Sequence, residues 1–207
     1  MPTKPLNPQN LNPQNLCLAQ LPEADALLDR DPLALLVGML LDQQVGMEKA
    51  FTGPYVLAQR MGVEHLSAAD IADFDPDAFV ALFVGPPAIH RFPAAMAARV
   101  QAMARMLVEE YDASAAQVWS TASSGQELLN RLAALPGFGQ QKARIFVALL
   151  GKQCGVRPKG WRDAAGSYGL DDVYNSVADV TGPESLLKVR EHKREIKAAA
   201  KAATKPR

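Results

Sequence analysis

The chain has 207 residues, 48% of them hydrophobic and 21% charged, which is an ordinary globular composition that supports a substantial core. Basic and acidic side chains balance at 22 each, so the chain as a whole lacks the basic excess typical of nucleic-acid-binding proteins. No apolar run approaches the roughly 20 residues needed to cross a bilayer, and the start of the chain is polar. We therefore expect a soluble, unsecreted protein that makes no membrane contact.

The cysteine content does not suggest a disulfide framework or a cysteine-ligated metal. Cys17 and Cys154 are the two cysteines, and they lie far apart without the spacing of zinc or iron-sulfur ligands. Neither His65 nor His192 has a partner at metal-ligand spacing. We expect no metal and no cofactor.

Three segments are predicted. Residues 1–16 repeat Leu-Asn-Pro-Gln-Asn, a composition that disfavours helix and strand, so we expect a flexible arm. Residues 17–187 are expected to form the folded domain. Residues 188–207 carry eight basic and two acidic side chains, a net charge of +6, and are expected to form a basic tail. This tail is either part of a nucleic-acid-binding surface or the solvated end of a helix.

The folded domain is predicted to be helical. Asp31 before Pro32, Ser67 and Asp75 are typical N-caps, and Ser124 with Glu127 has the spacing of a capping box. The expected helices span residues 23–28, 32–41, 48–61 with an interruption near Gly53-Pro54, 67–71, 75–83, 92–111, 124–134 and 140–150. Strand candidates are almost absent. We expect an all-α fold of eight to ten helices.

The stretch Leu135-Pro-Gly-Phe-Gly-Gln-Gln-Lys-Ala143 joins two apolar helices through a short turn. Gly137 and Gly139 permit positive φ angles and leave main-chain N–H groups exposed beside a helix N-terminus, where an anion is favoured. A phosphate held by such groups is bound without reading the base. Phe138 is expected to plug the hairpin into the core. The alternative is an ordinary helix connection with a glycine cap.

This stretch resembles the helix-hairpin-helix of the DNA glycosylase (HhH-GPD) superfamily, which includes endonuclease III, adenine glycosylase and 3-methyladenine glycosylase. Upstream, Leu40-Leu-Asp-Gln-Gln-Val45 resembles the segment whose side chain enters the duplex where the target base leaves. The resemblance covers about residues 32–169. It implies a two-lobed fold with a groove for double-stranded DNA between the lobes, and we expect a nucleoid-associated cytoplasmic monomer.

By this match Gln44 is the candidate that fills the gap in the duplex, and Gln43 lies beside it. The alternative for both is a polar helix end without a DNA role. The candidate DNA-binding residues are Gly137, Phe138, Gly139, Gln141, Lys142, Gln43 and Gln44.

The resemblance implies cleavage of an N-glycosidic bond, which needs a carboxylate to stabilise positive charge on the sugar. In the family this acid follows the hairpin helix by about twenty residues, and here the pattern departs from that of the family. Asp163 is the candidate catalytic acid, a few residues beyond the expected place. The alternative for Asp163 is a helix cap or surface role, in which case Asp171 or Asp172 is the candidate catalytic acid.

The family's bifunctional members carry an amine nucleophile at the second residue after the hairpin's second glycine. Gln141 holds that position here, and Lys142 follows one step later. We therefore expect hydrolysis without strand cleavage. Lys142 is expected to contact a phosphate or the solvent, although a shift of register by one residue leaves the lyase reading open.

Trp161 and Tyr168 are candidates for stacking on an extruded base, with core packing as the alternative for both. Together these features predict a monofunctional DNA glycosylase that removes a damaged or mismatched base. Two other classes remain open: a non-catalytic DNA-binding protein that senses distorted duplex, and a helical interaction module, which the neutral net charge favours.

Overall fold

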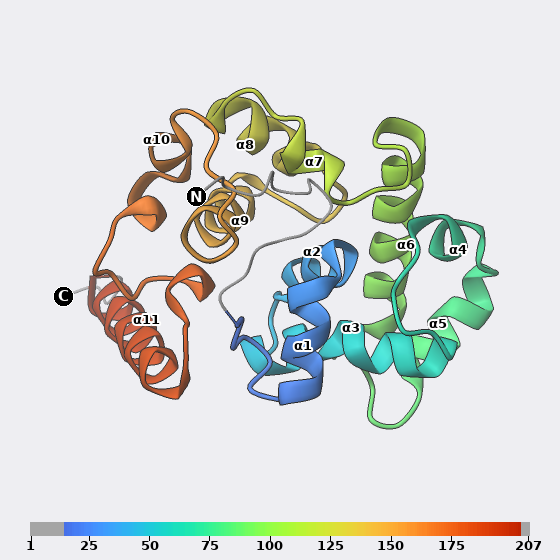
Figure 1. Cartoon of the computed structure of the whole chain (residues 1–207). Helices are drawn as coiled ribbons and strands as arrows, with labels where there is room; N and C mark the ends of the chain where they lie inside the picture. The colour runs from blue at the N-terminus through green and yellow to red at the C-terminus, as the bar shows by residue number, and fades with distance from the viewer. Residues whose placement is uncertain (1–14, 204–207) are drawn as a thin grey trace.

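The computed structural model describes residues 15–203 (Figure 1). The α-helices span Pro22–Arg30 (α1), Pro32–Leu41 (α2), Met47–Met61 (α3), Ala68–Asp73 (α4), Pro76–Val84 (α5), Pro93–Glu110 (α6), Gln117–Ser120 (α7), Gly125–Ala134 (α8), Gln140–Gln153 (α9), Trp161–Ala165 (α10) and Pro183–Ala203 (α11). Two 3₁₀ helices, Gly166–Gly169 (η1) and Val177–Asp179 (η2), complete the described range. No strand occurs between residues 15 and 203, so the predicted all-α class is confirmed.

The predicted caps start their helices. The Asp31 carboxylate accepts hydrogen bonds from the main-chain N–H groups of Leu33 (2.9 Å) and Ala34 (3.0 Å) at the start of α2. Its second oxygen accepts from Leu66 N–H at 2.8 Å, which ties this buried cap to the segment before α4. Ser67 and Asp75 cap α4 and α5 in the same way.

Two local predictions are corrected. The helix α3 is continuous through Gly53 and Pro54, because close packing against α2 holds it: a β-carbon at Gly53 would lie 2.6 Å from a Leu41 methyl group. At α8, Ser124 accepts from Glu127 N–H as expected, but the Glu127 carboxylate accepts from the N–H of Ser123 at 2.8 Å. The reciprocal half of the capping box is thus displaced by one residue.

Helix packing sorts the chain into two groups. In the first, α2 packs on α3, and α6 packs on α4 and α5; in the second, α9 packs on α8, α10, η1 and η2. Figure 1 shows α8 to α11 on one side of the molecule and α1 to α6 on the other. The first group is built around α2, which is almost fully buried, and the second around α9, whose C-terminal half from Phe146 to Gly151 is buried. The way α2 and α9 are placed against each other therefore positions the loop after α2 and the hairpin before α9.

The segment boundaries differ from the predicted ones. A boundary at residue 187 would fall inside α11, which begins at Pro183 and is anchored by the buried side chains of Leu186 and Val189. Near the other end, Leu16 is buried and its N–H donates to the Asp29 carboxylate at 2.8 Å. Residues 1–14 of the expected arm lie outside the described range. Among the helices of residues 15–203, none is long and apolar enough to cross a membrane.

Candidate nucleic-acid interface

The hairpin between α8 and α9 uses its two glycines differently. Gly137 has φ +83°, the left-handed region that favours glycine, and a β-carbon there would lie 3.3 Å from Leu40 Cγ. Gly139 has φ −117° and ψ 172°, an extended conformation that any residue adopts. The expectation of positive φ at both positions is therefore wrong for Gly139, because one left-handed residue reverses the chain and the next only has to start α9.

Open space faces Gly139. No atom of the described residues lies within 4 Å of where its β-carbon would be. Gly139 is the N-cap of α9, and no side chain in residues 15–203 caps this helix start. The first-turn amides and the positive end of the helix dipole are thus available to an anion. Phe138, by contrast, is only 8% exposed and packs edge-on against Phe146, as predicted.

The Lys142 side chain joins the start of α9 to the end of α2. Its ammonium donates to the main-chain oxygens of Met39 (2.7 Å), Leu40 (2.8 Å) and Asp42 (3.3 Å). The Met39 and Leu40 carbonyls belong to the last turn of α2 and Asp42 is its C-cap, where carbonyls lack partners within the helix and the dipole favours a cation. The contact spans about a hundred residues of sequence.

Burial lowers the pKa of Lys142 to about 8, against the opposing effect of nearby Asp42. All three of its donors are engaged, so the ammonium faces the protein and neither a phosphate nor the solvent. The predicted contact of Lys142 with a phosphate or the solvent is therefore corrected to a contact within the protein.

The loop after α2 exposes one glutamine side chain to solvent and binds the other within the protein. Gln43 turns inward: its amide group donates to Leu40 O at 2.6 Å and its amide oxygen accepts from Arg99 of α6 at 2.8 Å. Gln44 is exposed and has φ +55°, a left-handed conformation that non-glycine residues rarely adopt. Of the two predicted glutamines, only Gln44 therefore has an exposed side chain.

A buried histidine secures the peptide group between these glutamines. His90 has no exposed surface; Phe92 N–H donates to its Nδ1 at 3.1 Å, and its Nε2 lies 2.8 Å from Gln43 O. Since Nδ1 accepts, Nε2 carries the proton and donates to Gln43. Burial lowers the pKa of His90, which favours this neutral ring. The main chain just before Gln44 is thus anchored to the α5–α6 connection.

An acid borders the same loop. Asp42 is partly buried, and its carboxylate makes no hydrogen bond within the described part of the chain. Burial raises the pKa of Asp42, while the ammonium groups of Lys193 on α11 and of Lys142 oppose this shift. A poorly solvated carboxylate beside two cations is typical of functional sites.

The predicted catalytic and base-pocket residues lie elsewhere along α9. Trp161, at the start of α10, is 8% exposed and packs so closely on Gly151 that a β-carbon there would be 2.3 Å from its ring. Gly151 is twelve residues from Gly139, roughly 18 Å along the helix. Trp161 is therefore a core residue, and its predicted role in a base pocket is corrected. Asp163 is exposed and lies in the same short helix, two residues after Trp161.

Tyr168 and Gln141 meet at the hairpin end of α9. Gln141 donates from its side-chain amide to the Tyr168 hydroxyl at 3.0 Å, and the tyrosine remains partly exposed. Neither alternative acid takes part in the contact between Gln141 and Tyr168. Asp171 forms an ion pair with Arg162 at 3.0 Å, and Asp172 is exposed.

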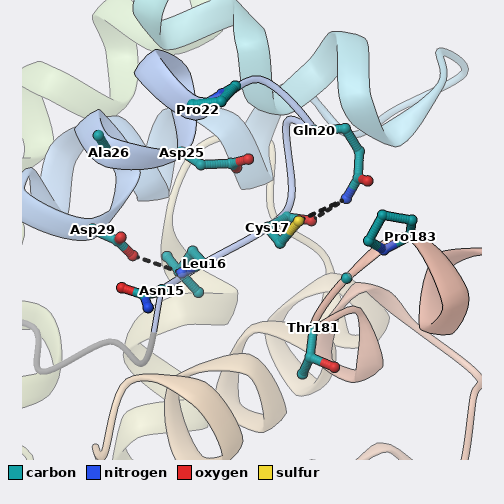
Figure 2. A pocket seen from close by; sticks show the side chains of 11 residues that line it. Asn15, Leu16, Cys17, Gln20, Pro22, Asp25, Ala26, Asp29, Thr181 and Pro183 are labelled. Atoms are coloured by element: carbon teal, nitrogen blue, oxygen red, sulfur yellow. Dashed lines mark hydrogen bonds between the residues drawn. The ribbon is translucent and has the colours of Figure 1, made fainter.

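A cavity of about 640 Å³ lies between the first described residues, α1 and the start of α11 (Figure 2). Its acids are occupied: Asp29 accepts from Leu16 N–H, and Asp25 accepts from two main-chain amides of the segment before α1. Burial raises the pKa of both carboxyls and of the Cys17 thiol. An acid-lined cavity of this kind does not suit a phosphate, and it contains no residue of the hairpin or of the Gln44 loop.

Comparisons with protein-family models, with characterised proteins and with solved structures give no match. Within residues 15–203 no three potential metal ligands of the histidine, cysteine or acidic type gather in one place. The hairpin, the Gln44 loop and their shared anchor, Lys142, are thus the features from which a function is inferred.

Replacing Lys142 tests this anchor. Lys142→Met keeps the unbranched stem but removes the donor to the Met39 and Asp42 carbonyls, so we expect the free energy of unfolding to fall by about 2 kcal/mol. The matched control is Arg144→Met on the exposed face of the same helix, for which a change within about 0.5 kcal/mol is expected. Urea denaturation measures both. Equal effects of the two substitutions would mean that the Lys142 contacts contribute nothing.

Proposed function

We propose that the protein binds duplex DNA and is a monofunctional base-excision glycosylase, which hydrolyses the N-glycosidic bond of a damaged or mismatched base. The observation that carries this proposal is the exposed, left-handed Gln44 on a loop that Lys142 fastens to the uncapped hairpin. In this proposal the groove between the two helix groups receives the DNA.

Phosphate binding is assigned to the hairpin. The amides at the start of α9 face open space at Gly139, and donors of this kind bind the DNA backbone independently of sequence. A protein that searches for rare lesions needs such contacts. Gln141 and Tyr168, joined by their hydrogen bond, flank the same helix start.

Gln44 is assigned to the duplex interior. A left-handed conformation at a non-glycine residue costs about 1 kcal/mol or more and persists only where the surroundings impose it. Here Gln43 is held by Leu40 and Arg99, and its carbonyl by His90. A rigidly presented polar side chain suits the gap that an extruded base leaves.

The chemistry is assigned to hydrolysis. The Lys142 amine is engaged by three carbonyls, and Gln141 offers no amine, so this part of the site lacks a free nucleophile for a Schiff base. In the hydrolytic step, the bond from the sugar carbon to the base breaks with its electron pair leaving on the base. Water then bonds to that carbon, and a carboxylate stabilises the charge that develops.

Two carboxylates compete for this role. Asp163 follows the family order, but α10 begins at the far end of α9 from the hairpin. Asp42 borders the Gln44 loop and lies near Lys142. On geometry we favour Asp42.

A second candidate function is a non-catalytic sensor of distorted duplex. The Asp163 region favours it, because this acid departs from the family spacing and its helix α10 begins at Trp161, which packs on Gly151 at the far end of α9. Such a sensor would retain the hairpin and Gln44 and release no base.

The hairpin assignment predicts that Gly139→Val weakens binding to every duplex by about tenfold or more, ~1.4 kcal/mol, because a side chain would occupy the phosphate position. The fold should persist, since the backbone conformation suits valine and the space is open. Gly182→Val is the matched control: this glycine also precedes a helix and faces open space. Fluorescence anisotropy with labelled duplexes measures the affinities. Wild-type binding by a folded Gly139→Val variant would contradict the assignment.

The Gln44 assignment predicts a loss of discrimination. Gln44→Gly removes the side chain and suits the left-handed backbone, so affinity for a mismatched or abasic duplex should fall toward that for intact duplex, which itself stays unchanged. Gln44→Asn, which tolerates the same backbone with a shorter side chain, should lie between. Competition binding with the two duplexes gives the ratio. A ratio unaffected by Gln44→Gly would remove Gln44 from the interface.

The reaction assignment predicts base release from at least one duplex in a set with uracil, alkylated purine, oxidised guanine or mismatches. The strand should break only after alkali, and borohydride should trap no covalent complex. Asp42→Asn should lower the rate more than Asp163→Asn while leaving binding nearly intact. The opposite order would return the role to Asp163. Release from no duplex would leave the sensor as the function, and a complex lost in Lys142→Gln would indicate a lyase.

A further inference from the structure

The basic C-terminal segment is a helix with two different faces. α11 (Figure 1) packs through Leu186 and Val189, and beyond them the same face continues with Arg190, Lys193 and Lys197. At 100° per residue, these five side chains lie within about 60° of Lys193 around the helix axis. The three acids of the helix, Glu184, Glu191 and Glu195, lie roughly opposite, about 160–200° away. The other cations of the helix, Lys188, Arg194 and Lys201, lie about 140°, 100° and 80° from Lys193. The face around Lys193 is therefore basic and free of acids, although cations also occur elsewhere on the helix.

One ion pair places the cationic face at the Gln44 loop. Arg190 forms an ion pair with Glu48, which is in the first turn of α3 and four residues after Gln44. One turn further, Lys193 lies close enough to Asp42 to lower the pKa of its carboxyl group. The Asp42 carbonyl in turn accepts from Lys142 in the first turn of α9. The hairpin, the Gln44 loop and α11 thus converge, although they are far apart in sequence.

We propose that this face of α11 is a second DNA-backbone surface, on which Lys193 and Lys197 contact phosphates of the duplex whose distorted step faces Gln44. The proposal rests on the proposed DNA binding and adds to it a partner surface outside the hairpin. Both lysines are exposed, and neither makes a hydrogen bond or ion pair among the described residues. Arg190 is occupied by Glu48 and holds the helix against α3.

Phosphate is the ligand that the charge pattern favours. Lysine ammonium groups in a row beside a second phosphate site match the repeating charge of a nucleic-acid strand, and each neutralised phosphate releases counterions. An acid-free face with two unpaired lysines gives a chain with no net charge a locally basic surface where a duplex would pass. An acidic protein partner would meet the same cations but would not need Gln44 or the hairpin.

The salt dependence of DNA binding tests the surface. Compared with the wild type, the Lys193→Gln/Lys197→Gln variant should show a slope of log affinity against log salt that is smaller in magnitude by about 1.8, or ~0.9 for each lost phosphate contact. Lys197→Gln alone should account for about half. The matched control, Arg30→Gln/Arg105→Gln, removes two exposed cations from α1 and α6 and should leave the slope unchanged. Fluorescence anisotropy of a labelled duplex from low to moderate salt gives the slopes.

Arg190 is kept in every variant so that α11 remains docked, and circular dichroism checks that the helix content is unchanged. A wild-type slope in the double variant, together with weak binding by Gly139→Val, would overturn the α11 surface and leave the proposed function standing. Equal losses of slope in the double variant and in the control would also overturn it, since the effect would then be general charge. No binding of the wild type to any duplex at low salt would overturn both.

Discussion

A single ammonium group at the end of a helix holds this structure's candidate site together. Lys142 supplies donors to three carbonyls at the C-terminal end of α2, and it does so from the first turn of α9. Since α2 and α9 are the centres of the two helix groups, this contact aligns the groups at one point. The Leu40 side chain, within 3.4 Å of a β-carbon position at Gly137, fills the space beside it and excludes any larger residue there.

The conformation of the loop that follows α2 depends on contacts with neighbouring elements. Gln43 is bonded on both sides of its amide, and His90 holds its carbonyl, so the left-handed Gln44 is imposed by contacts on three elements rather than by its own preference. Such a loop is prepared for a ligand before the ligand arrives, which lowers the ordering cost of binding. The hairpin offers the complementary feature, an uncapped helix start in open space.

Electrostatics in this protein depend on placement rather than on total charge. The net charge is zero, yet Arg190, Lys193 and Lys197 lie on the face of α11 that is turned toward the Gln44 loop, while the acids of the helix lie on the opposite side. The cavity lined by Asp25 and Asp29 lies elsewhere, with its carboxylates already bonded to main-chain amides. A locally basic surface and an acid-lined cavity therefore coexist in a chain without net charge.

The sequence by itself determined the helical class, the capped starts of α2, α4 and α5, and the hairpin with Phe138 in the core, because caps, glycine turns and apolar periodicity act over a few residues. It did not reveal the inward turn of Gln43, the burial of Trp161 on Gly151, or the roles of Arg99 and His90, which carry no motif. The Lys142 contact, across about a hundred residues, was equally hidden. Only tertiary packing decided these, since a side chain's partner is set by which distant backbone comes within about 3 Å of it.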